Sequence, residues 1–565
     1  TKWDHTKWSP NYRNDNRIET HESGTAPCKT ACPAHVAVQG YLKLAAQGRY
    51  DEALALIKRE NPLPAICGRV CNRRCEDACT RGRVDAAVAI DEVKKFIAQR
   101  DLDAATRYVP PVVMPTRAGG FDQKIAIIGA GPAGLSCAFY LAEKGYKPVV
   151  FEKNERPGGM LTYGIPSFKL EKDVIEAEVE IIRLMGAEFR YGVEVGRDVT
   201  LDELREQGFK AFYVAIGCQG GRLAGIPGED AEDVTVAVDF LREVNSGKID
   251  ALPGRTIVVG GGNVAIDVAR NACRLGSEHV EMFCLESEAQ MPASEEERRE
   301  AVEDGAHISC GWGPKEVHLD EAGRVCGITF KRCTRVMDDE GRFAPEYDEN
   351  DLRRVDADRV VMSIGQSIVW GDLLAGSKVE LGRGRGALAD PQTYQTAEPD
   401  IFVGGDVYTG PSFAIDAIAA GHEAAVSIHR FVQPGSTLTI GRNQRRYTAL
   451  DRDDVVIESY DNASREVAHV DREREKAAPF SEYVETFTEE QVRAETARCL
   501  GCGASIVDPN KCIGCGLCTT KCAFDAIHLD RDRPECSTMV KYEQKLPSLG
   551  KYALKRAIKI KFGKK

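Results

Sequence analysis

Cysteines are the residues of this chain whose type and spacing most directly suggest chemistry. Thirteen of the 20 lie in two groups near the ends of the chain, and the others are scattered through the middle, where buried reduced thiols are expected. In the first group, C-x3-C steps bring two sulfur atoms to one side of a turn, as an iron–sulfur cluster requires. Its members are Cys28, Cys32, Cys67, Cys71, Cys75 and Cys79.

The second group lies after residue 498. A C-x2-C pair, Cys499 and Cys502, precedes a C-x2-C-x2-C-x3-C run with the spacing of bacterial ferredoxins, although Ala523 stands where proline is usual. Zinc is the alternative for the N-terminal group, but structural zinc usually takes one C-x2-C pair plus another pair. Six cysteines with a proline directly after Cys32 favour iron–sulfur, and we expect two to four 4Fe–4S clusters, with three favoured. The remaining cysteines of this group are Cys512, Cys515, Cys518, Cys522 and Cys536.

A glycine-rich turn between a strand and a helix offers a second kind of chemistry. Residues 124–128 are typical of a buried parallel strand, and a GxGxxG turn opens the apolar helix that follows. The first glycine permits the tight turn, the second lets the backbone approach a pyrophosphate, and the third allows close helix–strand packing. The next predicted strand ends in Glu152, at the sequence distance from the turn where a carboxylate binds the ribose hydroxyls of a dinucleotide. The predicted dinucleotide-binding residues are Gly129, Gly131, Pro132, Ala133, Gly134 and Glu152.

A second turn of this kind follows the strand predicted at residues 256–259. It has the pattern GxGxxA, so we expect two dinucleotides face to face. Residues 400–406 then resume the first unit, which makes the second unit an insertion. The segment 156–166 lacks the C-x4-C redox pair of flavin-dependent disulfide reductases, so electrons must leave a flavin by another route. The further cofactor-binding residues predicted are Gly159, Met160, Gly217, Gly260, Gly262, Asn263, Val264, Ala265, Gly365, Gly405 and Asp406.

Composition excludes several classes of protein. The net charge of −12 argues against nucleic-acid binding, no run of 18 or more apolar residues occurs, and residues 1–30 lack a signal-peptide core. We therefore expect a cytoplasmic protein that binds neither nucleic acid nor a membrane. The basic C-terminal segment, residues 541–565, is interpreted as a solvated tail or, alternatively, as a segment that docks on an acidic partner.

Taken together, these motifs resemble the small subunit of glutamate synthase and its relatives. Those relatives include the flavin subunits of electron-bifurcating, ferredoxin-dependent transhydrogenases and the N-terminal half of dihydropyrimidine dehydrogenase. The resemblance implies that the first glycine turn and Glu152 hold FAD, that Asp406 binds its ribityl chain, and that the second turn holds the nicotinamide cofactor. The motifs that carry it are residues 67–71, 129–134, 158–166, 260–265, 291–293 and 404–406.

The expected fold class is α/β, with two Rossmann-like dinucleotide-binding domains, one inserted in the other, an N-terminal helical iron–sulfur domain and a C-terminal ferredoxin-like module. The expected parts are a helical iron–sulfur domain (1–120), the first part of the FAD-binding domain (121–250), an NAD(P)H-binding domain (251–390), the second part of the FAD-binding domain (391–435), a charged linker (436–498), a ferredoxin-like 4Fe–4S module (499–540) and a basic tail (541–565).

The resemblance implies an FAD-dependent NAD(P)H oxidoreductase subunit. It would pass electrons between a nicotinamide nucleotide and the ferredoxin-type clusters of a multisubunit complex, of the electron-bifurcating transhydrogenase type. The cofactors carry the chemistry, so no catalytic side chain is expected. Expected partners are other subunits of a redox complex and ferredoxin or a ferredoxin-like domain. Two alternatives are the small subunit of a glutamate synthase and a non-catalytic iron–sulfur scaffold.

One position predicts which nucleotide is used. In relatives that use NADPH, an arginine pair before Met-Pro-Ala grips the 2′-phosphate. Here Glu286 occupies the place of an arginine, and a carboxylate accepts hydrogen bonds from a free 2′-hydroxyl and repels a phosphate. We therefore expect NADH. Against this, GxGxxA is common among NADP sites, and Arg270 or Arg274 is an alternative phosphate ligand.

The resemblance also implies a C-x2-C pair before Cys28, where this chain has Thr20 and Ser23. The pair at Cys499 and Cys502 resembles that missing segment. We expect three clusters, held by Cys28, Cys79, Cys499 and Cys502; by Cys32, Cys71 and Cys75 with Cys67 or a non-cysteine ligand; and by Cys512, Cys515 and Cys518 with Cys522 or Cys536. The alternative is a self-contained two-cluster ferredoxin at the C-terminus, in which Cys522 joins Cys499 and Cys502.

Overall fold

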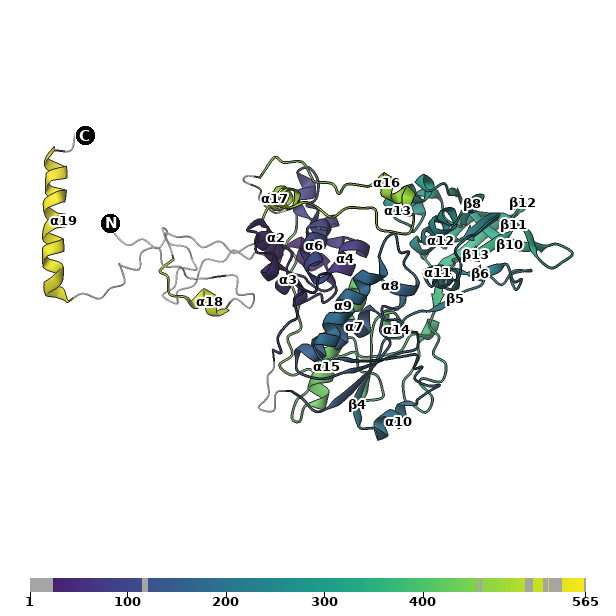
Figure 1. Ribbon diagram of the computed structural model, residues 1–565, viewed down its shortest axis with the longest axis horizontal. Helices are drawn as coiled ribbons and strands as arrows, with labels where there is room; N and C mark the ends of the chain where they lie inside the picture. The colour runs from purple at the N-terminus through teal and green to yellow at the C-terminus, as the bar shows by residue number, and fades with distance from the viewer. Residues whose placement is uncertain are drawn as a thin grey trace. The chain divides into compact units, whose positions relative to one another are not determined.

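A computed structural model of the chain describes residues 24–113, 120–453, 455, 457, 460–503, 512–521, 527 and 541–562. The chain divides into two compact units, Thr1–Ala504 and Ser505–Lys565. The first unit holds a helical domain and two domains built on parallel sheets (Figure 1).

The helical domain comes first in the chain. Its helices bury one face, as in α6, where Val93 and Ile97 are completely buried. Helix α4 is joined to the next domain, because the Glu178 carboxylate accepts the N–H groups of Ala65 and Ile66 at 2.7 and 3.0 Å. The elements are α1 (Pro27–Ala31), α2 (Val38–Ala46), α3 (Tyr50–Lys58), α4 (Pro64–Val70), α5 (Arg74–Asp77), η2 (Thr80–Arg83), α6 (Ile90–Ala98) and η3 (Gln99–Asp101).

A five-stranded parallel sheet, in the order β15-β4-β1-β2-β3, carries the first glycine turn. Helices α7 and α15 pack closely, because a Cβ on Gly421 would lie 2.2 Å from the carbonyl oxygen of Ala133. The elements are β1 (Lys124–Ile128), α7 (Pro132–Glu143), β2 (Val149–Glu152), α8 (Met160–Tyr163), α9 (Lys172–Leu184), β3 (Glu188–Tyr191), α10 (Leu201–Glu206), β4 (Phe209–Val214), η5 (Arg383–Arg385), β15 (Ile401–Val403), α14 (Asp406–Thr409) and α15 (Ala414–Val432).

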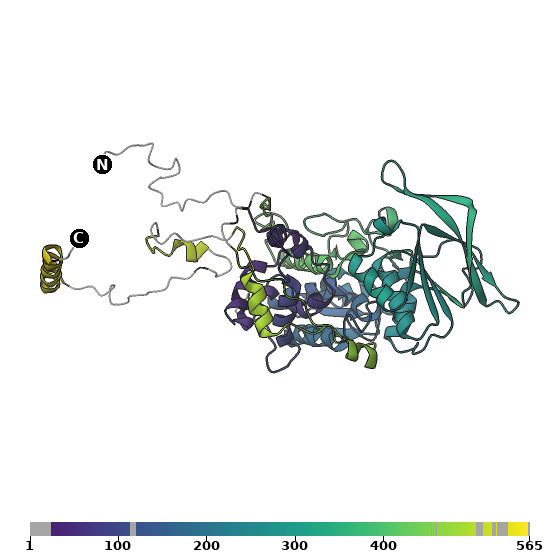
Figure 2. The ribbon, with the colours of Figure 1, turned by 90° about the horizontal axis from the view of Figure 1, so that it is seen from above.

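A second five-stranded parallel sheet, β6-β13-β7-β8-β9, carries the second glycine turn. An antiparallel sheet, β10-β11-β12, continues from it, and its long hairpin projects on the side away from the helical domain (Figure 2). The elements are β6 (Val234–Val236), α11 (Ala237–Asn245), β7 (Arg255–Val259), α12 (Asn263–Arg274), β8 (His279–Cys284), η4 (Glu288–Gln290), α13 (Glu295–Glu303), β9 (His307–Cys310), β10 (Trp312–Leu319), β11 (Val325–Met337), β12 (Phe343–Val355) and β13 (Arg359–Met362).

The insertion of one Rossmann-like unit in the other is confirmed, because β15 follows the whole second sheet yet pairs in parallel with β4. A short ribbon of β5 (Gly220–Gly221) and β14 (Gln366–Ser367) joins the two domains. The inserted domain therefore lies between these two strands and does not match the expected 251–390. Strand β6 already belongs to the second sheet, and Trp370 and Leu373 pack into the core of the first domain.

Residues 436–498, expected to be a linker, belong to the first unit, and much of their described part packs against its other domains (Figure 1). Tyr483 follows α16 (Arg472–Ala477) in this segment, and its hydroxyl accepts a hydrogen bond from Arg270 of the second domain at 2.7 Å. In α17 (Glu489–Ala497), the Glu495 carboxylate accepts the Ala89 N–H at 2.7 Å. Several charged side chains of this segment also form ion pairs with other parts of the unit, which composition alone does not reveal.

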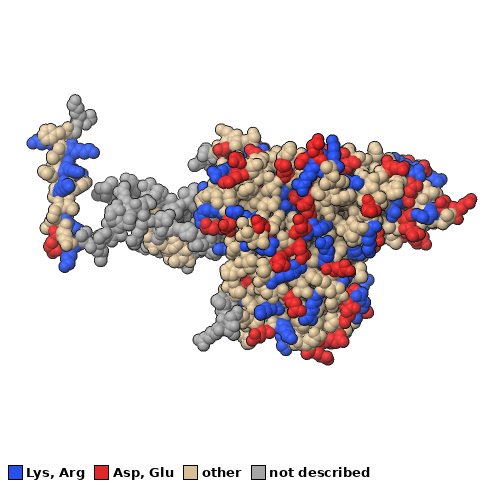
Figure 3. Space-filling model, in the orientation of Figure 1, with Lys and Arg blue, Asp and Glu red and all other residues tan. Residues whose placement is uncertain are grey.

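The unit that starts at Ser505 includes the described helices α18 (Leu517–Lys521) and α19 (Tyr542–Phe562). Helix α19 is exposed along its described length and carries basic side chains (Figure 3), among them Lys551, Lys555 and Lys559. Over the part of the chain that the structure describes, no helix has the length and apolar character needed to cross a membrane.

Candidate dinucleotide and iron–sulfur sites

The glycines of the first turn meet three different demands of the backbone. Gly129 has a φ of +105°, and a Cβ there would lie 2.4 Å from the carbonyl oxygen of Ala215. A Cβ on Gly134 would lie 1.9 Å from the carbonyl oxygen of Gly129, so α7 can start this close to β1 only with glycine. A Cβ on Gly131 would meet no other atom within 4 Å, so the backbone at this residue is open to a ligand. A pyrophosphate fits here, at the N-terminus of α7.

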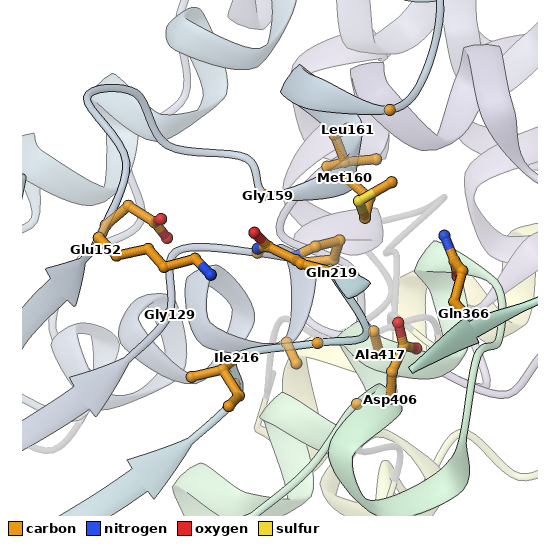
Figure 4. Close-up of a pocket in the computed structure, with 18 of the residues that line it drawn as sticks. Gly129, Glu152, Gly159, Met160, Leu161, Ile216, Gln219, Gln366, Asp406 and Ala417 are labelled. Atoms are coloured by element: carbon orange, nitrogen blue, oxygen red, sulfur yellow. The ribbon is translucent and has the colours of Figure 1, made fainter. Parts of the chain in front are cut away.

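Glu152, the last residue of β2, lies beside this turn (Figure 4). It is 3% exposed, and its Oε2 accepts the Ala130 N–H at 2.8 Å. Its Oε1 accepts hydrogen bonds from the backbone and side-chain amides of Asn154 at 2.9 and 2.7 Å. The acid is therefore held where a ribose ligand is expected.

A cavity of about 260 Å³ has both the first turn and Asp406 in its wall (Figure 4). Val264 and Asp267 of α12 also line it, so the helix that opens at the second glycine turn faces the same space as Gly131. The predicted residues in its lining are Gly129, Gly131, Pro132, Ala133, Glu152, Gly159, Met160, Gly217, Val264, Gly405 and Asp406.

Sequence reasoning missed Gln219, Gln366 and Trp370, which also line this cavity. These residues belong to the two crossings between the domains, where no periodic pattern or cofactor motif singles them out. Gln366 could have been inferred only from its place directly after the predicted Gly365.

Asp406 begins α14 directly after Gly405, whose φ is +66°. Its Oδ1 accepts the Ser412 N–H at 3.3 Å, and burial raises the pKa of this carboxyl to about 6. A partly buried acid in the cavity wall suits a ligand that donates hydrogen bonds from hydroxyl groups. The ribityl chain of FAD has that chemistry, so the residues present fit FAD.

The second glycine turn repeats the geometry of the first. Gly260 has a φ of +141°, and a Cβ there would lie 2.3 Å from the carbonyl oxygen of Ser363. Gly262 has no such neighbour within 4 Å of its Cβ position. Ala265 is completely buried in α12, and the Asn263 Oδ1 accepts the N–H of Ser294 at 3.1 Å. Gly365, with a φ of +113°, lies beyond the end of β13.

Glu286 borders this second turn, because a Cβ on Gly261 would lie 3.0 Å from its Oε2. The alternative phosphate ligands, Arg270 and Arg274, are engaged in ion pairs instead. Both bind Asp304, at 2.7 and 2.9 Å respectively. These two guanidinium groups therefore serve to join α12 to the end of α13.

Four cysteines from opposite ends of the chain line one small cavity in the helical domain. Burial raises the pKa of the Cys28 thiol, and the neighbouring Cys499, Cys79 and Cys502 raise it further. The Gln39 side chain donates a hydrogen bond to the Cys502 carbonyl oxygen at 2.6 Å. Four thiolates around a cavity are the ligand set of a 4Fe–4S cluster. The cysteines that line the cavity are Cys28, Cys79, Cys499 and Cys502.

These thiols surround a space rather than a point. In the described part of the chain, no three His, Cys, Asp or Glu side chains are grouped so that they could hold a single metal ion.

A second group of thiols lies nearby in the sequence. Burial raises the pKa of Cys71 and Cys75, and Cys32 contributes to the increase in both. The buried Lys94 interacts with these thiols and forms an ion pair with Asp91. Cys67 is completely buried and lies near both Cys71 and Asn61.

The remaining predicted cluster ligands belong to the C-terminal unit. Cys512 accepts the Gly514 N–H at 3.4 Å, and Cys515 and Cys518 follow it. Cys522 and Cys536, which were predicted as ligands of the third cluster, lie outside the described residues.

Two Rossmann-like domains that line one cavity, the first with its glycine turn and the second with the helix that its glycine turn opens, define a flavin- and pyridine-nucleotide-dependent oxidoreductase. The chain belongs to the pyridine nucleotide-disulphide oxidoreductase family, whose profile matches residues 123–421. A profile described as dihydropyrimidine dehydrogenase domain II, 4Fe-4S cluster, matches residues 20–106, and a 4Fe-4S binding domain matches residues 505–528. The expected fold class and enzyme class are confirmed.

The resemblance to the glutamate synthase small subunit and its relatives is also confirmed. The chain is 35% identical to NADP(+)-dependent formate dehydrogenase subunit beta of Moorella thermoacetica, over 85% of this chain and 70% of that protein. It is 35% identical to the glutamate synthase [NADPH] small chain of Escherichia coli, over 73% and 89%. It is 32% identical to NADPH-Fe(3+) oxidoreductase subunit beta of Geobacter sulfurreducens, over 85% and 75%.

Proposed function

We propose that this chain carries electrons between a nicotinamide nucleotide and the iron–sulfur clusters of a multisubunit redox complex of the electron-bifurcating transhydrogenase type. One observation carries the proposal: Val264 and Asp267 from the second dinucleotide domain line the same cavity as Gly131 and Asp406 from the first. Cofactors held at the two glycine turns would therefore share one space.

FAD, when bound, exchanges a hydride with nicotinamide and single electrons with clusters. The chain's own residues bind and orient it. The open backbone at Gly131 and the N-terminus of α7 would hold the pyrophosphate, Glu152 a ribose, and Asp406 the ribityl hydroxyls. The apolar walls near Ile128 and Leu161 would exclude water from the cavity.

For the clusters, we propose the three ligand sets expected from the sequence. The cavity that Cys28 and Cys79 share with Cys499 and Cys502 supports the first. The proximity of Cys32 to Cys71 and Cys75 supports the second, with Cys67 or a non-cysteine group as the fourth ligand. The match of the 4Fe-4S binding domain to residues 505–528 supports a third cluster in the C-terminal unit.

The ferredoxin-like C-terminal unit favours the transhydrogenase type over a glutamate synthase subunit. The glutamate synthase small chain aligns with 73% of this chain, whereas the two beta subunits align with 85%. Intact glycine turns argue against a non-catalytic scaffold. We propose other subunits of a redox complex and ferredoxin, or a ferredoxin-like domain, as partners, and the cytoplasm as the location.

We also propose NADH as the preferred nucleotide. The names of the three relatives specify NADP(+) or NADPH, so Glu286 would mark a difference within the family. The support is that Glu286 borders the second turn while Arg270 and Arg274 are bound to Asp304.

Dye-linked oxidation of NADH by the full chain, purified anaerobically with FAD, tests the function. Gly262→Val is the informative variant, because Gly262 has an extended backbone with a φ of −91° that tolerates valine, while the added methyl groups occupy the phosphate space. We expect this variant to keep FAD and lose activity. A wild-type chain that holds FAD but oxidises neither nucleotide would instead support the scaffold alternative.

Iron analysis with EPR tests the ligand sets. We expect a double variant, Cys499→Ser with Cys502→Ser, to lose about four iron atoms, one cluster. The control is Cys326→Ser, which changes a half-buried thiol outside both cysteine groups. A chain ending at Ala504 should keep about eight iron atoms. Retention of only about four after this truncation would favour a self-contained two-cluster ferredoxin at the C-terminus.

A further inference from the structure

Two thiols that the proposed function does not use lie beside the second glycine turn. Cys284 ends β8 and Cys310 ends β9, and the two residues are directly paired in neighbouring parallel strands. Their sulfur atoms are 3.6 Å apart. Cys284 is buried, whereas Cys310 is partly exposed.

We propose that Cys284 and Cys310 form a reversible disulfide that weakens the binding of the nicotinamide nucleotide. The proposal rests on the proposed function only in taking the second glycine turn as the nucleotide site. It assigns a redox-sensitive modification to a pair of residues that has no part in electron transfer between the cofactors.

The backbone permits this bond. Neighbouring strands lie about 4.8 Å apart, which falls within the Cα separation of about 4.4–6.8 Å that disulfides span. The sulfur atoms must approach from 3.6 Å to about 2.0 Å. Rotation about the two Cα–Cβ bonds can supply much of this change while β8 and β9 stay paired. In reducing compartments, such bonds are usually transient and serve catalysis or redox sensing.

Cys284 couples the pair to the nucleotide site. A Cβ on Gly261 of the second turn would lie 2.8 Å from the Cβ of Cys284 and 3.5 Å from its sulfur atom, which is the atom that oxidation moves. The Cys284 sulfur is also 3.7 Å from the carbonyl oxygen of Glu286, which accepts the Gly311 N–H at 2.9 Å. Oxidation removes the Cys284 S–H donor and turns its sulfur toward Cys310. The Glu286 carbonyl and the glycine turn therefore lose a fixed neighbour on the side that holds the nucleotide.

A low-molecular-weight disulfide is a sufficient oxidant. The Cys310 thiolate attacks one of its sulfur atoms, that S–S bond breaks, and one thiol leaves. Cys284 then loses its proton, and its sulfur displaces the second thiol from Cys310. The two cysteines lose two electrons and two protons, and the oxidant becomes two thiols. Burial raises the pKa of Cys284, which is consistent with its acting second.

The test treats the anaerobic holoprotein with oxidised glutathione, with iron content and the visible spectrum confirming that the clusters stay intact. Peptide mass spectrometry should find residues 284 and 310 linked. The Kd for NADH, measured by calorimetry, should rise at least tenfold and return to its starting value after dithiothreitol. Cys310→Ser should show neither effect, whereas the control Cys326→Ser should respond like the wild type.

Two results would overturn the proposal: no linked peptide, or a linked protein that binds NADH as tightly as the reduced form. Failure of the proposed function looks different. In that case the reduced wild-type protein would bind neither NADH nor NADPH before any oxidant is added, and the second glycine turn would not be the nucleotide site.

Discussion

The Arg81 guanidinium donates a hydrogen bond to the carbonyl oxygen of Arg498 at 3.1 Å, across 417 residues of sequence. Arg81 lies two residues after Cys79, and Arg498 directly precedes Cys499, so the bond joins the two segments that contribute to the thiol cavity. The Arg498 guanidinium also binds Asp85 at 2.9 Å. These contacts therefore hold Cys499 and Cys502 on the helical domain.

Arg498→Met should destabilise the first unit and the first cluster together. The change leaves Glu495, which is completely buried, without its charged partner, a loss that typically costs about 3–5 kcal/mol. We expect a lower urea midpoint by circular dichroism and a loss of about four iron atoms. Arg493→Met, in the helix that ends directly before Arg498, is the matched control, because Arg493 is exposed and pairs with Glu489 on the surface. An Arg498→Met protein with wild-type midpoint and iron content would contradict this account.

Glu286→Arg should shift the preference from NADH toward NADPH. The change removes an acceptor for the 2′-hydroxyl and supplies a cation for the 2′-phosphate. We expect the ratio of kcat/KM for NADH to that for NADPH to fall by about 10- to 100-fold, or roughly 1.4–2.8 kcal/mol. Glu288→Arg controls for charge, because Glu288 is exposed two residues further on. A wild-type enzyme that prefers NADPH, with little change in Glu286→Arg, would refute the NADH proposal.

FAD affinity should depend on the protonation of Asp406. Because its folded-state pKa is raised to about 6, the FAD-free protein holds the ionised carboxylate above pH 6. If this carboxylate accepts the ribityl hydroxyls, the Kd for FAD should rise about tenfold for each pH unit below 6 and stay level above it. Fluorescence titration measures this dependence. Asp406→Asn should lack the inflection near pH 6, and an identical profile in both proteins would contradict the role of Asp406.

Protonation of Asp406 should affect stability in the opposite direction to FAD affinity: a lower pH weakens FAD binding but stabilises the FAD-free protein. Burial raises the pKa of Asp406 above its ordinary value of 3.8, so its contribution to the stability of the FAD-free protein is greatest below about pH 4 and is lost as pH rises through 6. The difference between wild type and Asp406→Asn in the unfolding midpoint, followed from pH 4 to pH 7.5, should follow this course. A constant difference over that range would show that the carboxyl does not titrate there.

Local patterns predicted the elements that bind dinucleotides. The GxGxxG and GxGxxA turns specify strand, turn and helix within about fifteen residues, so β1 with α7 and β7 with α12 could be placed from sequence. The boundary between the two domains could not, because β6 and Trp370 take their places through pairing and packing with distant residues. The charged segment 436–498 was expected to be a linker because composition does not show which charges are paired.

The cysteine pattern likewise predicted some groups of thiols and missed another. The family resemblance implied a cysteine pair where this chain has Thr20 and Ser23, and a cluster needs four ligands, so Cys499 and Cys502 were expected to replace it. Cys284 and Cys310 gave no such signal, because each is isolated in sequence. Only the register of β8 and β9 places their sulfur atoms together.

Lys94 should raise the potential of the second proposed cluster. Its ammonium is buried, interacts with Cys71 and Cys75, and is paired with Asp91. Reduction adds negative charge to a cluster, so a nearby cation favours the reduced form. Lys94→Gln should therefore lower the midpoint potential, on the order of 100 mV for one charge at an effective dielectric constant of about 20.

An EPR-monitored redox titration of Lys94→Gln measures this shift, with iron content showing that the cluster is present. Lys95→Gln is the matched control, because the neighbouring Lys95 ammonium binds Glu482 at 2.7 Å on another side of α6. We expect its cluster potentials to stay much closer to those of the wild type. If Lys94→Gln keeps full iron and unchanged potentials, the second cluster does not lie at Cys32, Cys71 and Cys75.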